Sequence, residues 1–308
     1  MVNHIDIDEN LLLHQYPNVL PKLLLDRTTG NNLLWATEDY EHLGPGYLQR
    51  EEITIPSITR SNSGVIKPRV LKNRLEQTSR TKDKAEVFTP SWVCNQQNNA
   101  VDEAWFGRPG VFNIERENGW ISTSEPVAFP DSAGRTWKHY VDERRIEITC
   151  GEAPYLVSRY DSTTGKAIPV EERIGLLDRK LRVVSENCDS EQDYLDWAFR
   201  AFESTYGFEY QGDSLLLARE NVLFTFIDNV RLRLGRDPSP RELDKIALIV
   251  SWNLWQMDAY TSQPPFSISV NSAWMLDLGM EPPLVSKKCV VRDWRAKKTL
   301  AFEQLIQN

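Results

Sequence analysis

The chain has 308 residues, of which 41% are hydrophobic and 26% are charged, and its formal net charge is −8. This composition is that of a folded globular protein and excludes an intrinsically disordered chain. The acidic balance argues against tight autonomous binding to nucleic acid, which usually depends on a basic excess. No apolar run approaches the roughly 20 residues that span a bilayer, and no signal-peptide core follows Met1, so we expect a cytoplasmic protein without a membrane partner. The cysteines at positions 94, 150, 188 and 289 form no CxxC pair, which argues against a zinc ribbon and a disulfide framework.

The first 80 residues consist of short segments separated by glycine, proline and polar clusters, which are typical of turns. We interpret residues 1–80 as an N-terminal extension and residues 81–308 as the main domain. Within the extension, residues 53–58 alternate in part between apolar and polar, and Pro56 would restrict them to an edge strand. Residues 67–84 contain seven basic side chains, which form either a local nucleic-acid contact or an ordinary solvated surface.

From residue 90 onwards, helical and strand-like patterns alternate. Thr89 is expected to cap a helix over residues 90–106, with Pro90 at its first position. A loop-rich insertion follows at residues 117–133. Strands are then predicted at residues 145–150, 206–209, 252–257 and 288–294, and helices at residues 155–160, 195–205, 214–234 and 241–250. Strands that alternate with helices indicate a mainly parallel sheet with helices on its faces.

Polar residues follow the first predicted strand in a pattern that suits a ligand. Glu147 is followed by Cys150 and Gly151 and then by Tyr155 and Leu156. In doubly wound folds, ligands lie beyond the carboxyl ends of the strands, and a glycine there lets the backbone approach the ligand closely. The alternative is an ordinary turn in which Glu147 is solvated.

Two further acidic residues end the next two predicted strands. Glu209 is in the place of a residue that accepts hydrogen bonds from ribose hydroxyls, and Asp213 suits a helix N-cap. Asp258 could accept from the amino group of an adenine ring, on which Trp255 or Tyr260 could stack. Alternatively, the carboxylates are surface groups and the aromatic residues belong to the core.

Thr89 offers a hydroxyl and a backbone amide just before a helix, an arrangement that suits a ligand carboxylate. In combination, these segments resemble the adenine-specific DNA methyltransferases of the gamma arrangement, which include the modification subunits of restriction systems. The resemblance extends over about residues 82–260, in the family's order. It implies an α/β fold with a Rossmann-like doubly wound sheet, to which the irregular N-terminal extension is added, and S-adenosylmethionine as the cofactor. It assigns cofactor contacts to Phe88, Thr89, Pro90, Glu147, Cys150, Gly151, Tyr155, Glu209, Tyr210, Asp258 and Ala259, and it matches the family's next helix to Ala218, Arg219 and Asn221.

The chain departs from this family at the catalytic motif. The family's Asn-Pro-Pro-Tyr tetrapeptide, which accepts from the target amine and stacks on the flipped base, is absent. Asp293 and Trp294, at the end of the last predicted strand, are the preferred catalytic candidates by their topological position. The segment Gln263, Pro264, Pro265 and Phe266 is chemically closer, but it leaves no room for a helix and a fourth strand after Asp258.

Two functions therefore stand as expectations. The first is methyl transfer to the exocyclic amine of adenine in double-stranded DNA, within a restriction-modification or anti-restriction system, with a protein partner that supplies target recognition. The second is a catalytically inactive, S-adenosylmethionine-binding regulatory or decoy component of such a system. A nucleotide-dependent oxidoreductase would need a GxGxxG turn, and this chain offers only one glycine there. The four histidines show no spacing typical of metal ligands.

Overall fold

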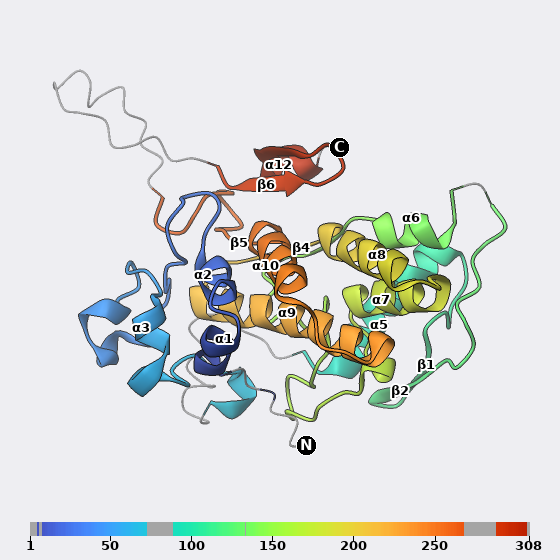
Figure 1. Cartoon of the computed structure of the whole chain (residues 1–308), viewed down its shortest axis with the longest axis horizontal. Coiled ribbons are helices and arrows are strands. Elements are labelled where there is room, and N and C mark those ends of the chain that lie inside the picture. The colour runs from blue at the N-terminus through green and yellow to red at the C-terminus, as the bar shows by residue number, and fades with distance from the viewer. Residues whose placement is uncertain (1–4, 6–7, 73–88, 133, 268–287, 307–308) are drawn as a thin grey trace.

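The computed structural model describes residues 5, 8–72, 89–132, 134–267 and 288–306 (Figure 1). The protein has a mixed α/β fold with a three-stranded parallel sheet. Its strands are β3 (Arg145–Glu147), β4 (Thr205–Glu209) and β5 (Leu254–Gln256), in the order β3-β4-β5. Residue Glu147 pairs with Gly207, and Glu209 pairs with Gln256. Since all three strands run in one direction, they end at one side of the sheet, which we call the carboxyl edge.

Two helices connect each pair of neighbouring strands. Helices α7 (Leu176–Asn187) and α8 (Glu191–Glu203) lie between β3 and β4, and α9 (Gly212–Leu234) and α10 (Pro240–Asn253) lie between β4 and β5. The start of α10 is encoded locally, because Ser239 and Glu242 form a capping box and Pro240 occupies the first turn. The predicted helices at residues 195–205, 214–234 and 241–250 and the parallel sheet are therefore confirmed, with shifted boundaries.

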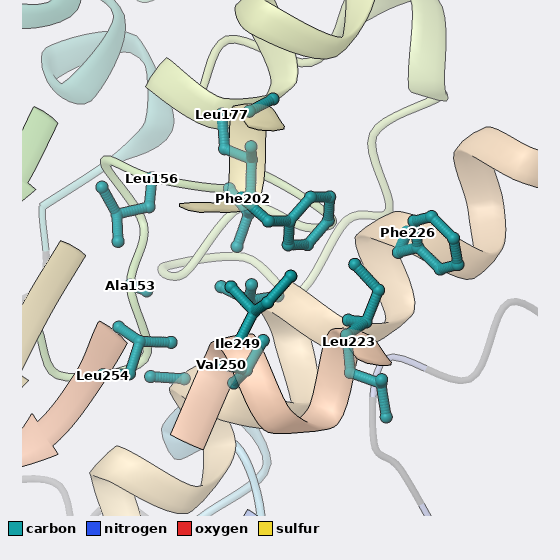
Figure 2. Close-up of a cluster of buried hydrophobic side chains, with 14 of the residues drawn as sticks. Ala153, Leu156, Leu177, Phe202, Leu223, Phe226, Ile249, Val250 and Leu254 are labelled. Atoms are coloured by element: carbon teal, nitrogen blue, oxygen red, sulfur yellow. The ribbon is translucent and has the colours of Figure 1, made fainter. Parts of the chain in front are cut away.

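The four helices share a hydrophobic core with the sheet (Figure 2). Leu177, Phe202 and Phe226 come from α7, α8 and α9, and they are almost fully buried. The loop after β3 contributes to the same core. Its members in Figure 2 are Ala153 and Leu156, which lie near Leu254 of β5. The apolar residues that follow the first strand therefore pack in the core rather than forming a helix at residues 155–160, where the structure has turns and a bridge from Tyr160 to Ala167.

The N-terminal region is helical and irregular. It contains α1 (Glu9–Gln15), α2 (Val19–Leu24), α3 (Ile55–Ile58) and the short 3-10 helices η1 (Glu41–Leu43), η2 (Pro45–Tyr47), η3 (Arg60–Asn62) and η4 (Arg69–Leu71). The predicted edge strand at residues 53–58 is wrong. Thr54 and Ser57 form a capping box and proline is accepted in a first helical turn, so this segment turns into α3. Helix α2 packs on α10, and the apolar residues of this region belong to the main core.

The remaining elements of the described residues are α5 (Ser91–Phe106), α6 (Trp137–Asp142), η5 (Val170–Glu172) and α12 (Phe302–Ile306). Two antiparallel hairpins join them, β1 (Asn113–Arg116) with β2 (Gly119–Ser122) and β6 (Val290–Asp293) with β7 (Lys298–Ala301). The last predicted strand exists as β6. It pairs with β7, however, and is not a fourth parallel strand. Its hairpin and α12 cover one face of the sheet, where Val291 and Phe302 pack with Phe208 and Trp255 (Figure 1). None of the helices in the described ranges combines the length and the apolar character needed to cross a membrane.

Candidate functional site

The three carboxylates that the sequence singled out all follow strands that end at the carboxyl edge. Glu147 is the last residue of β3, Glu209 is the last residue of β4, and Asp258 lies two residues beyond β5. The strands stay linked beyond their ends, because the Cys150 amide donates to the Phe208 carbonyl at 2.9 Å and the Met257 amide donates to the Glu209 carbonyl at 2.9 Å. The parallel register therefore brings these three residues to one side of the sheet.

Glu147 organises the loop that follows β3. Its carboxylate accepts hydrogen bonds from the backbone amides of Tyr155 at 3.3 Å and Leu156 at 3.1 Å. The loop between them bends through positive φ angles at Thr149, Gly151 and Ala153. Burial raises the pKa of Glu147 well above its ordinary value, although the two amides act in the opposite direction. The buried Glu147 carboxylate therefore holds the loop after β3 in place through these two hydrogen bonds.

Glu209 joins the first and second strand ends. Its carboxylate accepts from the amides of Gly151 at 2.8 Å, Tyr210 at 2.8 Å and Gln211 at 3.2 Å. Burial raises the pKa of this carboxyl group, and the three amides offset part of that rise. An ionised carboxylate has about four lone-pair sites, so these donors leave about one for a ligand hydroxyl. Cys150 is buried beneath this contact and contributes packing.

Asp258 keeps one oxygen free of protein contacts within the described residues. Its Oδ1 atom accepts from the amides of Tyr260 at 2.8 Å and Thr261 at 3.1 Å, whereas Oδ2 makes no hydrogen bond there. Ala259 and Tyr260 are exposed, and Tyr260 is 100% exposed. The free carboxylate oxygen is therefore positioned to accept a hydrogen bond from a ligand.

Aromatic rings lie next to Asp258. The rings of Tyr210 and Phe266 are 6.1 Å apart at an interplanar angle of 67°, and the Arg50 guanidinium lies 4.5 Å from the centre of the Phe266 ring. Phe266 has a positive φ of 59°. Positive φ angles at residues other than glycine also occur nearby, at Ala36 and Ser262. Strained backbone of this kind often accompanies ligand sites, which favours a functional role for this edge.

The turn before α5 lies against the loop of Glu147. Helix α5 begins at Ser91, so Pro90 is the N-cap and the expected cap at Thr89 is wrong. The Ser91 amide instead donates to Asp161 Oδ2 at 2.8 Å. Burial raises the pKa of Tyr155, and the neighbouring Thr89 side chain acts to lower it. The Thr89 carbonyl accepts from Ser162 Oγ at 2.8 Å. Thr89, Pro90 and Tyr155 are therefore neighbours, while Phe88 lies outside the described residues.

Asp161 provides a pH-dependent test of this turn. Burial acts to raise the pKa of Asp161, but hydrogen bonds from Thr163, the Ser91 amide and Thr164 together hold it below its ordinary value of 3.8. The ionised form therefore stabilises the fold above about pH 4, and this contribution is lost as the pH falls through the lowered pKa.

We expect Asp161→Asn to lower the free energy of unfolding by ~1–3 kcal/mol at pH 7, because the amide nitrogen cannot accept from Ser91. Chemical denaturation at pH 7 and pH 3.5 should give a smaller difference at the lower pH. Asp131→Asn, at an exposed position, is the control, and a difference that grows on acidification would contradict this role.

The N-terminal region also reaches the carboxyl edge, which sequence reasoning missed. The Gln256 side chain accepts from the Leu34 amide at 2.9 Å and donates to the carbonyls of Leu34 and Tyr210, both at 2.8 Å. The Gly212 amide donates to the Trp35 carbonyl at 3.0 Å. No local sequence signal marks the contacts of Leu34 and Trp35, because these residues are more than 170 positions away from Gln256 and Gly212.

The start of α9 differs from the expected cap at Asp213. Gln211 is the N-cap, and Asp213 is buried in the first turn. Its Oδ2 atom accepts from the Tyr40 hydroxyl at 2.7 Å and forms an ion pair with Lys72 at 3.3 Å. Asp213 therefore holds the N-terminal region rather than capping the helix.

The helix residues that matched the methyltransferase pattern have structural partners. Arg219 is fully buried and donates to the carbonyls of Leu23, Leu25 and Leu254. Asn221 donates to the carbonyl of Glu152 at 3.1 Å. Both side chains therefore bind backbone carbonyls of other segments and hold these segments against α9.

Asp293 and Trp294 lie at the opposite end of the sheet. Asp293 pairs with Arg144, which precedes β3, at 3.2 Å, and Trp294 Nε1 donates to Asn253, which precedes β5, at 2.7 Å. At the start of β6, the Cys289 thiol contacts the carbonyl of Gln256, the last residue of β5. Strand β6 therefore runs antiparallel to β5. The geometry corrects the catalytic interpretation of Asp293 and Trp294, because they adjoin the amino ends of the strands.

The alternative segment lies at the carboxyl edge instead. We call residues 262–267 the Gln263 turn. The Asp258 amide donates to the Gln263 carbonyl at 2.8 Å, so the turn folds back directly on Asp258. Gln263, Pro264 and Pro265 are buried, and Phe266 reaches Tyr210. The segment was disfavoured because no helix and fourth strand fit between Asp258 and Gln263. The structure needs neither element, since this turn lies at the carboxyl edge directly after β5.

A surface pocket of about 950 Å³ lies beside the turn before α5. Its lining includes Pro90, Trp92, Trp120, Asp161 and Lys166, and does not include the three carboxylates. Within the described ranges, no three histidine, cysteine, aspartate or glutamate side chains lie close enough to hold a metal ion. No family model, curated protein or solved structure matches this chain.

Proposed function

We propose that the chain binds S-adenosylmethionine at the carboxyl edge of a Rossmann-like doubly wound sheet, and that it transfers the methyl group to the exocyclic amine of adenine in DNA. The observation that carries this proposal is that Glu147, Glu209 and Asp258 end or follow three adjacent parallel strands, with the Thr89 turn beside the first of them. In open parallel sheets this edge is where nucleotide-like ligands bind.

The residues present suit the parts of this cofactor. The remaining lone pair of Glu209 suits a ribose hydroxyl, and Asp258 Oδ2 suits the adenine amino group. Tyr210 and Ala259 flank these two acceptors, and Tyr210 offers an aromatic face. Thr89 and the loop around Gly151 would take the methionine part. When bound, the cofactor supplies an electrophilic methyl group on a sulfonium.

The chain's own contribution to methyl transfer is positioning. The side-chain oxygen of Gln263 and the carbonyl of Pro264 would accept hydrogen bonds from the target amine, and Phe266 would stack on the extruded base. The amine nitrogen would gain the methyl group as the bond between that methyl and the sulfonium sulfur breaks, leaving a neutral thioether, and the nitrogen would lose a proton to solvent. The target DNA is double-stranded under this proposal, and a partner chain supplies sequence recognition in a cytoplasmic restriction-modification system.

A second candidate is a cofactor-binding component without catalysis. It is favoured by the absence of an Asn-Pro-Pro-Tyr motif and by the position of Asp293 and Trp294 at the wrong end of the sheet. It predicts cofactor binding without methyl transfer.

The test of the binding step is calorimetric titration with S-adenosylmethionine. We expect Asp258→Asn to weaken binding by roughly 10- to 100-fold, because a hydrogen bond to a charged group contributes about 1.5–3 kcal/mol. Asparagine keeps the Oδ1 acceptor for Tyr260 and Thr261, so the turn is preserved. Asp293→Asn is the matched control and should bind as the wild type does. No binding by the wild type would reject both candidates.

Radiolabelled methyl transfer to mixed-sequence DNA separates the two candidates. The methyltransferase proposal predicts incorporation into adenine by the wild type and by Asp293→Asn, and loss of incorporation in Gln263→Ala with cofactor binding retained. Binding without any incorporation would favour the non-catalytic component.

A further inference from the structure

Arg50 is held at the carboxyl edge by the N-terminal region. Around it, the Trp35 amide donates to the Glu51 carbonyl at 3.0 Å and the Ala36 amide donates to the Gln49 carbonyl at 2.9 Å. The neighbouring Leu34 is bound through both backbone groups to Gln256 of β5. A segment far from the predicted motifs therefore carries this arginine to the candidate site.

The guanidinium of Arg50 faces an aromatic ring and makes no ion pair within the described residues. It is exposed, and it lies 4.5 Å from the centre of the Phe266 ring. The charge of Arg50 also acts on Tyr210, whose ring lies beside that of Phe266. The pKa of Tyr210 is raised by burial and by Asp258, and it is lowered by Arg50. Arg50, Tyr210 and Asp258 are thus within electrostatic range of one another.

The surroundings of Arg50 combine a cation with aromatic faces. Phe266 and Tyr210 are half-buried, and Tyr260 is fully exposed beside Asp258. Aromatic faces stack on bases, and the planar guanidinium of an arginine can bind two phosphate oxygens at once. On a chain of net charge −8, such an arginine provides local attraction for a polyanion.

We propose that Arg50 contacts a backbone phosphate of the DNA strand whose adenine enters the site, with Phe266 holding the guanidinium in place. This inference rests on the proposed function and adds a substrate contact to the same site. The N-terminal region is then part of the DNA-binding surface, even though the proposed cofactor contacts are assigned to residues from position 88 onwards.

The test is fluorescence anisotropy with a labelled, mixed-sequence single-stranded oligonucleotide at several salt concentrations. A single strand is suitable because an extruded base is locally unpaired. We expect Arg50→Ala to weaken binding about 5- to 20-fold, and to reduce the slope of log affinity against log salt by about 0.7, the value for one phosphate on a single strand. Arg50→Lys should keep most of the slope because it keeps the charge. Arg116→Ala, at an exposed arginine of β1, should leave both affinity and slope unchanged.

Two further measurements keep this proposal separate from the proposed function. Calorimetry should give the same S-adenosylmethionine affinity for Arg50→Ala and the wild type, and thermal unfolding should give similar midpoints. An unchanged salt slope in a folded Arg50→Ala variant would overturn the phosphate contact, even if the cofactor binds. Equal losses of cofactor and oligonucleotide affinity would also overturn it, since Arg50 would then belong to the cofactor pocket. Absence of cofactor binding by the wild type would instead reject the proposed function.

Discussion

Replacing Gly212 by alanine is expected to destabilise the protein by more than ~4 kcal/mol, or to prevent folding. A Cβ atom at this position would lie 1.9 Å from the Leu34 carbonyl oxygen and 2.9 Å from its carbonyl carbon. Backbone atoms cannot move aside as the end of a flexible side chain can. The N-terminal region would have to leave the start of α9, which breaks the hydrogen bond from Gly212 to Trp35 and the pairing of Leu34 with Gln256.

Chemical denaturation of Gly212→Ala and the wild type measures this effect. Gly119→Ala is the matched control, because a Cβ there meets nothing within 4 Å and the residue does not have a positive φ. We expect the control to stay within about 0.5 kcal/mol of the wild type. A Gly212→Ala variant as stable as the control would show that the N-terminal region does not pack on α9 as described.

Replacing Arg179 by methionine is expected to cost ~3–5 kcal/mol, because it leaves a buried charge without its partner. Arg179 and Asp102 are both almost fully buried and form an ion pair of 2.5 Å between α7 and α5. The Tyr140 hydroxyl also donates to Asp102, at 2.9 Å, and Arg179 also donates to Asn95 and Asn99. This network fastens α5, and with it the Thr89 turn, to the body of the protein.

The control for Arg179→Met is an exposed ion pair with the same distance between nitrogen and oxygen. Arg231 and Asp237 are also 2.5 Å apart, but their side chains are 56% and 64% exposed. Arg231→Met should therefore cost less than about 1 kcal/mol. Adding Asp102→Asn to Arg179→Met should recover part of the loss, because no unpaired charge is then left buried. Equal losses for Arg179→Met and Arg231→Met would contradict the role of burial.

Patterns of local origin were predicted well. The helix over residues 91–106 follows from its spacing of apolar residues, and α10 follows from its cap and first-turn proline. The three parallel strands follow from β-prone runs that alternate with helices. Local signals were misleading where a cap or a distant contact outweighed them. Thr54 and Ser57 convert an alternating segment into α3, and the residues after β3 are needed in the core, so they do not form a helix.

The sequence predicted the part of the candidate site that lies at the ends of the parallel strands. It did not predict the parts whose position depends on how strands pair. Glu147, Glu209 and Asp258 reach one edge because parallel strands end together, which follows from the order of elements alone. Asp293 was assigned to the same edge on the assumption of a fourth parallel strand. It lies at the other end because β6 turns back along β5 and pairs with β7. Strand direction depends on pairing partners, which a single sequence does not specify.

The sequence by itself determined the alternation of strands and helices and the acidic residue at each strand end, because these depend on spacing over a few residues. Only the tertiary structure decided that Arg50, Gln256 and the Gln263 turn share the edge with these acids. The contacts of the N-terminal region with this edge join residues separated by more than two hundred positions, as between Leu34 and Gln256 and between Arg50 and Phe266. Contacts over such separations are selected by the packing of the whole core, and no local pattern of residues encodes them.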